Sequence, residues 1–419
     1  MVVLTGPLPV RAALAAVAAA ALPWLGGHQG AAVLATRSSP GLSPGGGAPV
    51  RAAEQAQLNA IGVPAAWRLS HGHGVTVGVL DTGVDTGAPD LSGSVSTGPD
   101  YTLGADPPGY QPPHLHGTFI ASLIAGHGSG PGRAGGIIGV APAARVLSVR
   151  VILDDQEPGV GPYNTDPRFS DAIGQGIRYA ASHGAGVINL SLGSVEPSRA
   201  MQSALAYAVS RGIVVVASAG NSGATGPAYT PYSYPASFTG VVSVAAVNDS
   251  GVRAPFSDRN SSVVLSAPGV NVIGAGPGGT YLQASGTSPA SAFVAGVATL
   301  IRSAYPELSP AQVEQAMISS AVRRPAAGYS TATGFGEVDA AAALRAAGRL
   351  ARDKPAAGLA PGRRFGRSRP GPIQVTHRDE ARIAALGGLG AAGAAGFLAV
   401  LAGFAVLTVR RLRGRRPAG

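Results

Sequence analysis

The hydrophobic positions of this chain fall into short apolar runs that alternate with longer segments of helical period. Runs of about five apolar residues are typical of buried strands, and apolar residues at every third or fourth position are typical of amphipathic helices. The runs predict strands at Val75–Leu80, Arg145–Ile152, Gly186–Leu190, Ile213–Ala217 and Val241–Val247. The longer segments predict helices at Gly117–Ala125, Asp171–His183, Ser198–Arg211, Pro289–Ser303 and Ser309–Ser320. This alternation predicts an α/β fold with a mostly parallel central sheet and helices on both faces.

The beginning of the chain is typical of a secretory signal peptide. Arg11 precedes an apolar stretch at Ala12–Leu25, which has the length of a signal-peptide hydrophobic region. Val33 and Ala35 are small enough for cleavage after Ala35. We therefore expect a signal peptide at residues 1–35, then a short N-terminal extension at 36–57 and one globular domain at 58–348.

The end of the chain predicts a membrane anchor. Residues 383–409 contain no charged side chain and exceed the roughly 20 residues that a helix needs to cross a bilayer. Arginines are concentrated in the segment that follows, 410–419, as in a cytoplasmic stop-transfer signal. The Pro-, Gly- and Arg-rich segment 349–382 cannot build a core and predicts an extended linker. We expect one C-terminal transmembrane helix at 383–409, with a basic cytoplasmic tail and an exported domain.

Composition narrows the classes of function. The formal net charge of +10 would suit a nucleic-acid-binding protein. However, much of this charge lies in the linker and the tail, and the central region has no basic run interleaved with aromatic residues, so we expect no nucleic-acid partner. The chain has no cysteine, which excludes disulfides and cysteine-held metals. No cofactor or metal site is predicted, because the nearest acidic group, Asp154, Asp155 and Glu157, is interpreted as a solvated loop.

Three polar residues stand where a serine nucleophile and its two partners would be needed. Ser288 follows a Gly-Thr turn and begins a helical segment, and the N-terminus of a helix favours negative charge. Asp81 ends the first predicted strand, at the edge where open α/β sheets place their sites. His116 opens a helical segment and is favoured over His114, because only His116 leads directly into Gly-Thr. Each residue alone is weak evidence, since serines often cap helices and aspartates often form turns.

These residues belong to four short motifs that together carry a family resemblance. The motifs are Asp81-Thr82-Gly83, His116-Gly117-Thr118, Ser218-Ala219-Gly220-Asn221 and Gly286-Thr287-Ser288. From about Ala66 to about Leu344 the chain resembles the subtilase family of serine peptidases. The order Asp, His, Ser is that of subtilisin and differs from the orders in chymotrypsin and the α/β-hydrolases. The resemblance implies a subtilisin-like three-layer fold and makes 58–348 a peptidase domain.

The resemblance and the chemistry of serine peptidases together give each residue a role. Ser288 would be the nucleophile, and His116 would be the base that takes its proton. Asp81 would hold the imidazole in the right tautomer and stabilise the imidazolium. Asn221 would donate its amide to the oxyanion, together with the Ser288 N–H.

Two further stretches bear on the substrate and on the nucleophile. The resemblance implies that Ser191, Leu192 and Gly193 lie along the substrate cleft, where backbone can pair with an extended peptide. Pro289 departs from the methionine that many subtilases have after the nucleophile. Proline is acceptable in the first helical turn, because the N–H that it lacks would be unpaired there.

Within the family, the overall layout is most similar to the mycosins, membrane-anchored proteases associated with type VII secretion in actinobacteria. The supporting features are the signal peptide, the segments Leu58–Trp67 and Gly334–Asp339, the basic linker and the single transmembrane helix. The resemblance implies a membrane-anchored, extracytoplasmic serine endopeptidase that acts on exported proteins or peptides, with type VII secretion membrane components as candidate partners. Two alternatives stay open: a general exported degradative subtilase, and a catalytically weak structural component of a secretion complex.

Overall fold

The computed structural model describes residues 47–223, 230–352, 396–398 and 400–404. The chain divides into two compact units, Met1–Lys354 and Pro355–Gly419. The labelled helices and strands below all belong to the first unit.

Most of the predicted terminal segments lie outside the described residues. This holds for the signal peptide at 1–35, the cytoplasmic tail at 410–419 and the linker at 349–382 except its first four residues. Of the predicted transmembrane segment 383–409, residues 396–398 and 400–404 are described, and they are helical. Within the described part of the chain, no helix has both the length and the apolar character needed to cross a membrane.

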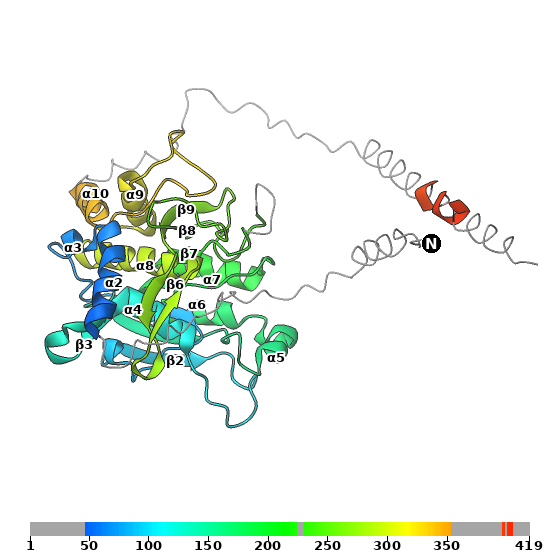
Figure 1. Cartoon of the computed structure of the whole chain (residues 1–419), viewed down its shortest axis with the longest axis horizontal. Coiled ribbons are helices and arrows are strands. Elements are labelled where there is room, and N and C mark those ends of the chain that lie inside the picture. The colour runs from blue at the N-terminus through cyan, green and yellow to red at the C-terminus, as the bar shows by residue number, and fades with distance from the viewer. Residues whose placement is uncertain (1–46, 224–229, 353–395, 399, 405–419) are drawn as a thin grey trace, which may run out of the picture. The chain divides into compact units, whose positions relative to one another are not determined.

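Seven parallel strands form the central sheet (Figure 1). Their spatial order is β2-β5-β1-β6-β7-β8-β9, and every neighbouring pair is parallel. The bounds are β1 Thr76–Asp81, β2 Val95–Asp100, β5 Arg145–Arg150, β6 Ala185–Leu190, β7 Val214–Ser218, β8 Val241–Val247 and β9 Val263–Pro268. The predicted parallel sheet is confirmed, and all five predicted strands are present with ends shifted by two residues at most.

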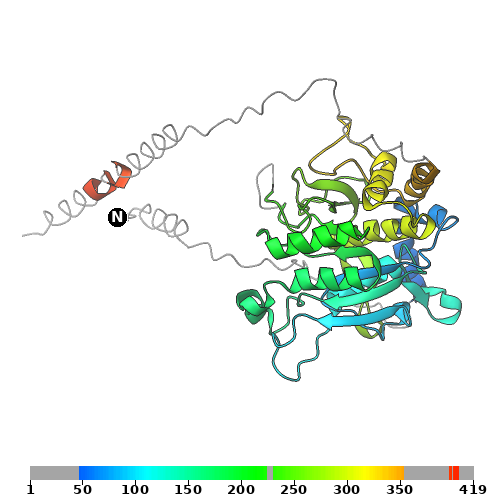
Figure 2. The ribbon, with the colours of Figure 1, turned by 180° about the vertical axis from the view of Figure 1, so that it is seen from behind.

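Helices cover both faces of the sheet, because side chains along each strand point alternately to the two faces. In β7, Val214 and Val216 enter the core that contains α4 and α8, whereas Val215 and Ala217 enter the core that contains α6 and α7. The helices are α2 Gly47–Ala60, α3 Val63–Ala66, α4 Leu115–Ala125, α5 Val160–Thr165, α6 Ala172–Ser182, α7 Arg199–Ser210, α8 Thr287–Ala304, α9 Pro310–Ser320 and α10 Ala340–Arg352. Figure 2, seen from behind, shows α6 and α7 in green in front of the sheet. The three-layer arrangement is confirmed.

Several short strands lack the apolar run or period that would predict them from the sequence. β2 is an edge strand with mostly half-exposed or exposed side chains, and it contains Gly98 and Pro99, so it lacks an apolar run. β9, at the other edge, is apolar only briefly before Pro268. Two small hairpins are too short to show a period; they pair β3 His127–Ser129 with β4 Gly135–Ile138, and β10 Val272–Ala275 with β11 Tyr281–Ala284.

Two helices begin earlier than the sequence predicts, and the shift affects the candidate site. α4 begins at Leu115 and α8 at Thr287, each two residues before the predicted start. His116 and Ser288 therefore lie inside the first turn of their helices, where backbone N–H groups have no partner within the helix. Pro289 is the third residue of α8, so its missing N–H costs no helical hydrogen bond.

The two predicted boundaries of the peptidase domain fall inside helices. α2 spans the boundary between 57 and 58 and packs on β4 and β10. Its Arg51 donates to the carbonyl oxygens of Gly135 and Gly136 at 2.8 and 2.9 Å, and Glu54 accepts the Ile138 N–H at 2.9 Å. α10 continues past the boundary at 348 and buries one side against α9. Helical structure thus begins before residue 58 and continues past residue 348.

Buried Glu54 predicts a pH-dependent stability. Burial raises the pKa of its carboxyl to about 8, although the Ile138 N–H and Arg51 oppose this shift. The folded protein binds the proton of the Glu54 carboxyl more tightly than the unfolded chain does. The contribution of this proton to the free energy of unfolding is therefore complete below the unfolded pKa of 4.5 and is lost as pH rises to about 8. Glu54→Gln cannot ionise, so above this range we expect it to be more stable than the wild type by roughly 2–5 kcal/mol. Thermal unfolding at several pH values measures this difference, and a gap that is the same at acid and alkaline pH would contradict the assignment.

Candidate active site

The sequence-predicted residues gather at the carboxyl edge of the sheet. Asp81 is the last residue of β1, which lies between β5 and β6. On one side of β1 lie β5 and β2, and on the other side lie β6, β7, β8 and β9. The direction in which successive strands are added to the sheet therefore reverses at β1. Open α/β sheets bind ligands in the crevice at such a point. α4 packs on both β1 and α8, and these two helices carry His116 and Ser288.

Asp81 and His116 form a buried hydrogen-bonded pair. His116 Nδ1 lies 2.7 Å from Asp81 Oδ1, and the same oxygen accepts the Thr82 N–H at 2.8 Å. Asp81 is fully buried, and His116 is 9% exposed. A carboxylate can only accept, so the pair makes Nδ1 the donor and leaves Nε2 to accept a proton. His114 lies apart from this pair, with its Nδ1 2.7 Å from the Thr82 carbonyl oxygen.

The turn after β1 and the start of α4 approach each other closely. The Gly117 N–H donates to Thr82 Oγ1 at 3.0 Å. A Cβ on Gly117 would lie 2.0 Å from the Gly83 carbonyl oxygen, so only glycine permits this contact. Close backbone approach therefore sets the position of the imidazole relative to the aspartate.

Ser288 is bonded to the stretch that follows β6. Its Oγ donates to the Ser191 carbonyl oxygen at 3.2 Å, and Ser191 Oγ donates to the Ser288 carbonyl oxygen at 3.1 Å. Among the described residues, no hydrogen bond joins Ser288 to His116. Catalytic hydrogen bonds are often long in free enzymes and shorten when substrate binds. Ser288 Oγ would have to turn from Ser191 towards His116 Nε2 to act as a nucleophile.

The three residues predicted to line the substrate cleft continue directly from β6. Ser191 and Leu192 are buried, and Gly193 is half-buried. The next residue, Ser194, forms an antiparallel bridge with Tyr234 through two backbone hydrogen bonds of 2.7 and 2.8 Å. Ser191 is the member of the trio that contacts Ser288, so the stretch runs beside the candidate nucleophile.

Asn221 is held next to Ser288 by Thr287. Its Oδ1 accepts the Thr287 N–H at 2.9 Å and the Thr287 hydroxyl at 3.0 Å. Thr287 Oγ1 accepts the Gly220 N–H at 3.2 Å, which ties the loop to the start of α8. These bonds fix the orientation of the amide, whose Nδ2 group is its donor and can donate to a substrate oxygen.

Sequence reasoning missed Asp258, which holds the loop around Asn221. Asp258 Oδ1 accepts the Ser222 N–H at 2.8 Å, and the Asp258 N–H donates to the Gly220 carbonyl oxygen at 2.9 Å. Both neighbours of Asn221 are therefore bonded to one residue. Burial raises the pKa of this carboxyl to about 6, although its bonds to Ser222 and Thr230 oppose the shift. No motif in the sequence marks an aspartate in this position.

The interpretation of Asp154, Asp155 and Glu157 as a solvated loop is wrong for two of the three. Asp154 and Glu157 are 7% and 3% exposed, and only Asp155 faces solvent. The Asp154 carboxylate accepts the first two N–H groups of α4, and Glu157 pairs with Arg150. These partners compensate for burying the two carboxylates. In the described ranges, no three acidic, histidine or cysteine side chains are grouped so that they could hold a metal ion.

Charges around His116 favour its protonated form. Burial lowers the pKa of the imidazole, but the charge of Asp81 and the hydrogen bond to it, with the charges of Asp154 and Asp155, raise that pKa above its ordinary value. Burial also raises the pKa of Asp154, and the backbone N–H groups that it accepts partly offset this. The arrangement stabilises an imidazolium, the species that forms when a histidine base has taken a proton.

Known proteins are similar to this chain in sequence and in fold. The family model described as the subtilase family matches residues 72–336. Subtilisin BL from Lederbergia lenta is 36% identical over 274 residues, which cover 65% of this chain and 92% of that protein. Among solved structures, MycP1 from Mycobacterium smegmatis is similar with a TM-score of 0.59 and 28% identity, over 69% of this chain and 84% of that chain. The MycP3 protease from the type VII (ESX-3) secretion system is similar with a TM-score of 0.58 and 30% identity, over 76% of this chain and 92% of that chain.

Proposed function

The chain belongs to the subtilase family and is a subtilisin-like serine endopeptidase, and we propose that it acts from the cell membrane on exported proteins, with Asp81, His116 and Ser288 as its catalytic residues. The observation that carries the catalytic part is the 2.7 Å hydrogen bond between His116 and Asp81. Its members come from the end of β1 and the start of α4, and Ser288 comes from the start of α8, which packs on α4. The three residue types of a serine peptidase therefore come from elements that meet at one edge of the sheet.

Peptide-bond hydrolysis would proceed through an acyl-enzyme. Ser288 Oγ attacks the scissile carbonyl carbon while His116 Nε2 takes the hydroxyl proton, and Asp81 keeps Nδ1 as the donor. The Asn221 amide and the Ser288 N–H stabilise the negative oxygen of the tetrahedral intermediate. The C–N bond then breaks, and the amine leaves with the proton from His116. Water, deprotonated by His116, hydrolyses the ester and restores the Ser288 hydroxyl.

The stretch Ser191, Leu192 and Gly193 would align the substrate. It follows β6 directly and is hydrogen-bonded to Ser288 through Ser191. An extended peptide can add to such a backbone by strand-like hydrogen bonds, which would bring the scissile carbonyl to the nucleophile. The proposed substrates are therefore extended segments of proteins or peptides.

Labelling by a fluorophosphonate probe tests the catalytic part of the proposal. The probe forms a covalent bond only with a serine that a neighbouring base activates. The full chain should be labelled, and both Ser288→Ala and His116→Ala should abolish the signal. Labelling that survives in Ser288→Ala would place the activated serine elsewhere. No labelling of a folded wild-type protein would favour the alternative of a catalytically weak structural component.

The membrane part of the proposal is supported by the ends of the sequence. Residues 383–409 carry no charge, and the arginine-rich segment 410–419 follows them. Together with the predicted signal peptide at 1–35, they favour a single-pass protein with the catalytic domain outside the cytoplasm and a short tail inside. Structural neighbours belong to the ESX-1 and ESX-3 type VII secretion systems, and we extend that association to this chain.

Fractionation of cells tests this arrangement. The full chain should sediment with membranes, whereas a form that ends before residue 383 should be released to the medium. Membrane retention of the shortened form would contradict the anchor. Co-purification of secretion-system membrane proteins with the full chain would support the type VII association. Their absence would favour the alternative of a general exported degradative subtilase.

A further inference from the structure

The N-terminus of α4 is capped by a residue far away in the sequence. The Leu115 N–H donates to Asp154 Oδ2 at 2.9 Å, and the His116 N–H donates to Asp154 Oδ1 at 3.0 Å. Each oxygen takes one of the N–H groups that a helix leaves without a partner, as an N-cap side chain does. His114, at the N-cap position itself, is left-handed and makes no capping bond with its side chain. Asp154 supplies the cap instead, from 38 residues further along the chain than His116.

Asp154 is in turn fixed to the strand beside β1. Its N–H donates to Glu157 Oε1 at 2.8 Å, and its carbonyl oxygen accepts the Glu157 N–H at 2.9 Å. Glu157 Oε2 pairs with Arg150, the last residue of β5. Arg150 is in register with Asp81 at the end of β1. β1 thus carries Asp81, and its neighbour β5 holds, through Arg150 and Glu157, the residue that caps the helix of His116.

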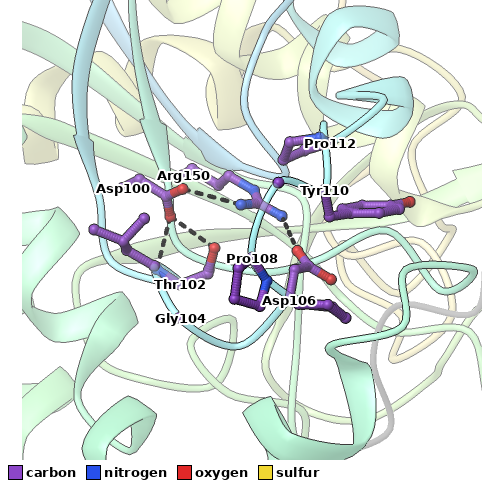
Figure 3. A pocket seen from close by; sticks show the side chains of 11 residues that line it. Asp100, Thr102, Gly104, Asp106, Pro108, Tyr110, Pro112 and Arg150 are labelled. Atoms are coloured by element: carbon purple, nitrogen blue, oxygen red, sulfur yellow. Dashed lines mark hydrogen bonds and ion pairs between the residues drawn. The ribbon is translucent and has the colours of Figure 1, made fainter.

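On the outer side of this cluster, Arg150 also pairs with Asp100 and Asp106 (Figure 3). The Arg150 guanidinium lies 2.9 Å from Asp100 and 3.2 Å from Asp106, on the wall of a cavity of about 360 Å³. Thr102 donates to Asp100 Oδ1 from its hydroxyl at 2.6 Å and from its N–H at 2.7 Å. A guanidinium that bridges three carboxylates cannot move away from Glu157 without leaving a buried carboxylate unpaired.

We propose that Asp154 is a positioning residue for His116, an inference that rests on the proposed role of His116 as the base. The Asp154 carboxylate fixes the start of α4, and so it fixes the imidazole relative to Asp81 and Ser288. Its negative charge also adds to that of Asp81 in stabilising the imidazolium. The charged groups that face His116 are Asp81 from β1, and Asp154 and Asp155 from the loop after β5.

Two substitutions separate the hydrogen bonds of Asp154 from its charge. Asp154→Asn keeps one acceptor oxygen and loses the charge, whereas Asp154→Ala loses both. Asp249→Asn, in an exposed turn after β8, is the matched control, because it removes the same charge from a residue that is not among the named charges acting on His116. With the full chain and a peptide substrate, we expect kcat/KM to fall about 10-fold in Asp154→Asn and about 100-fold in Asp154→Ala, mainly through kcat. We expect the control to match the wild type.

The pH dependence distinguishes this role from a merely structural one. Loss of a negative charge lowers the pKa of His116, so the acid limb of kcat/KM should move to lower pH by roughly 0.5–1 unit in Asp154→Asn. The limb of Asp249→Asn should not move. A ¹⁵N NMR titration of the His116 imidazole, assigned with His116→Gln, should show the same shift without any turnover.

The possible results distinguish a failure of this inference from a failure of the proposed function. An acid limb and an imidazole titration that stay unchanged in Asp154→Asn, with kcat/KM within about twofold of the wild type, would overturn the proposal. If Asp154→Ala does not fold, Asp154→Asn still decides the question. If the wild type hydrolyses no peptide and the His116 titration nevertheless moves in Asp154→Asn, the positioning contact stands and the proposed function fails.

Discussion

Ser288→Ala is expected to lower kcat for peptide hydrolysis by about 10⁶-fold, and His116→Ala by about as much, the size of loss known from the equivalent changes in subtilisin itself. Without the Ser288 hydroxyl no acyl-enzyme can form, and without the imidazole the hydroxyl keeps its proton. The two groups act in the same step, so the double variant should be no slower than either single variant. Hydrolysis of a chromogenic peptide by the full chain measures all three.

Two control variants, each removing the same kind of side chain elsewhere, test whether the loss of activity is a general effect of the substitution on folding. Ser243→Ala removes a buried hydroxyl on β8 that has no hydrogen-bond partner among the described residues. His183→Ala removes an exposed imidazole just after α6. Both should stay close to wild-type activity. If Ser288→Ala kept more than about 1% of the wild-type kcat, a different nucleophile would have to carry the reaction.

The central sheet could be predicted wherever its strands are buried on both faces. β1, β7 and β8 are almost continuous apolar runs, because helices cover both sides of a parallel sheet. β2 could not be predicted, because an edge strand needs no such run. Asp81 and His116 could be located because residue type, chain order and position at the ends of elements all agreed, and the structure pairs them.

Asp154 and Asp258 could not be located, because each acts through backbone N–H groups of distant segments. Acidic residues in loops are mostly exposed, so the sequence favours a solvated interpretation. No capping motif around Asp154 indicates that its carboxylate caps a helix that begins far upstream. The one available signal was its place after β5, since the carboxyl ends of neighbouring parallel strands lie at the same edge.

Asp81→Asn is expected to lower kcat by about 10⁴-fold and to leave the fold intact. In the wild type, Asp81 Oδ1 accepts the His116 Nδ1–H and the Thr82 N–H. An asparagine that placed its amino group beside the imidazole would make Nδ1 an acceptor and leave the ring proton on Nε2. Ser288 would face a donor where it needs an acceptor. The ¹⁵N shifts of the His116 ring report which nitrogen is protonated, and kcat measured on the same sample reports the loss.

Comparison of Asp81→Asn with Asp154→Asn shows how the two carboxylates divide their roles. Each variant removes one negative charge near His116, so both should move the acid limb of kcat/KM to lower pH. Only Asp81→Asn should reverse the tautomer, so its loss of rate should exceed that of Asp154→Asn by about 10³-fold. Equal losses would mean that charge alone accounts for the effect, and the tautomer argument would be wrong. A large loss in Asp154→Asn with little loss in Asp81→Asn would mean that the start of α4, rather than the aspartate, orients the imidazole.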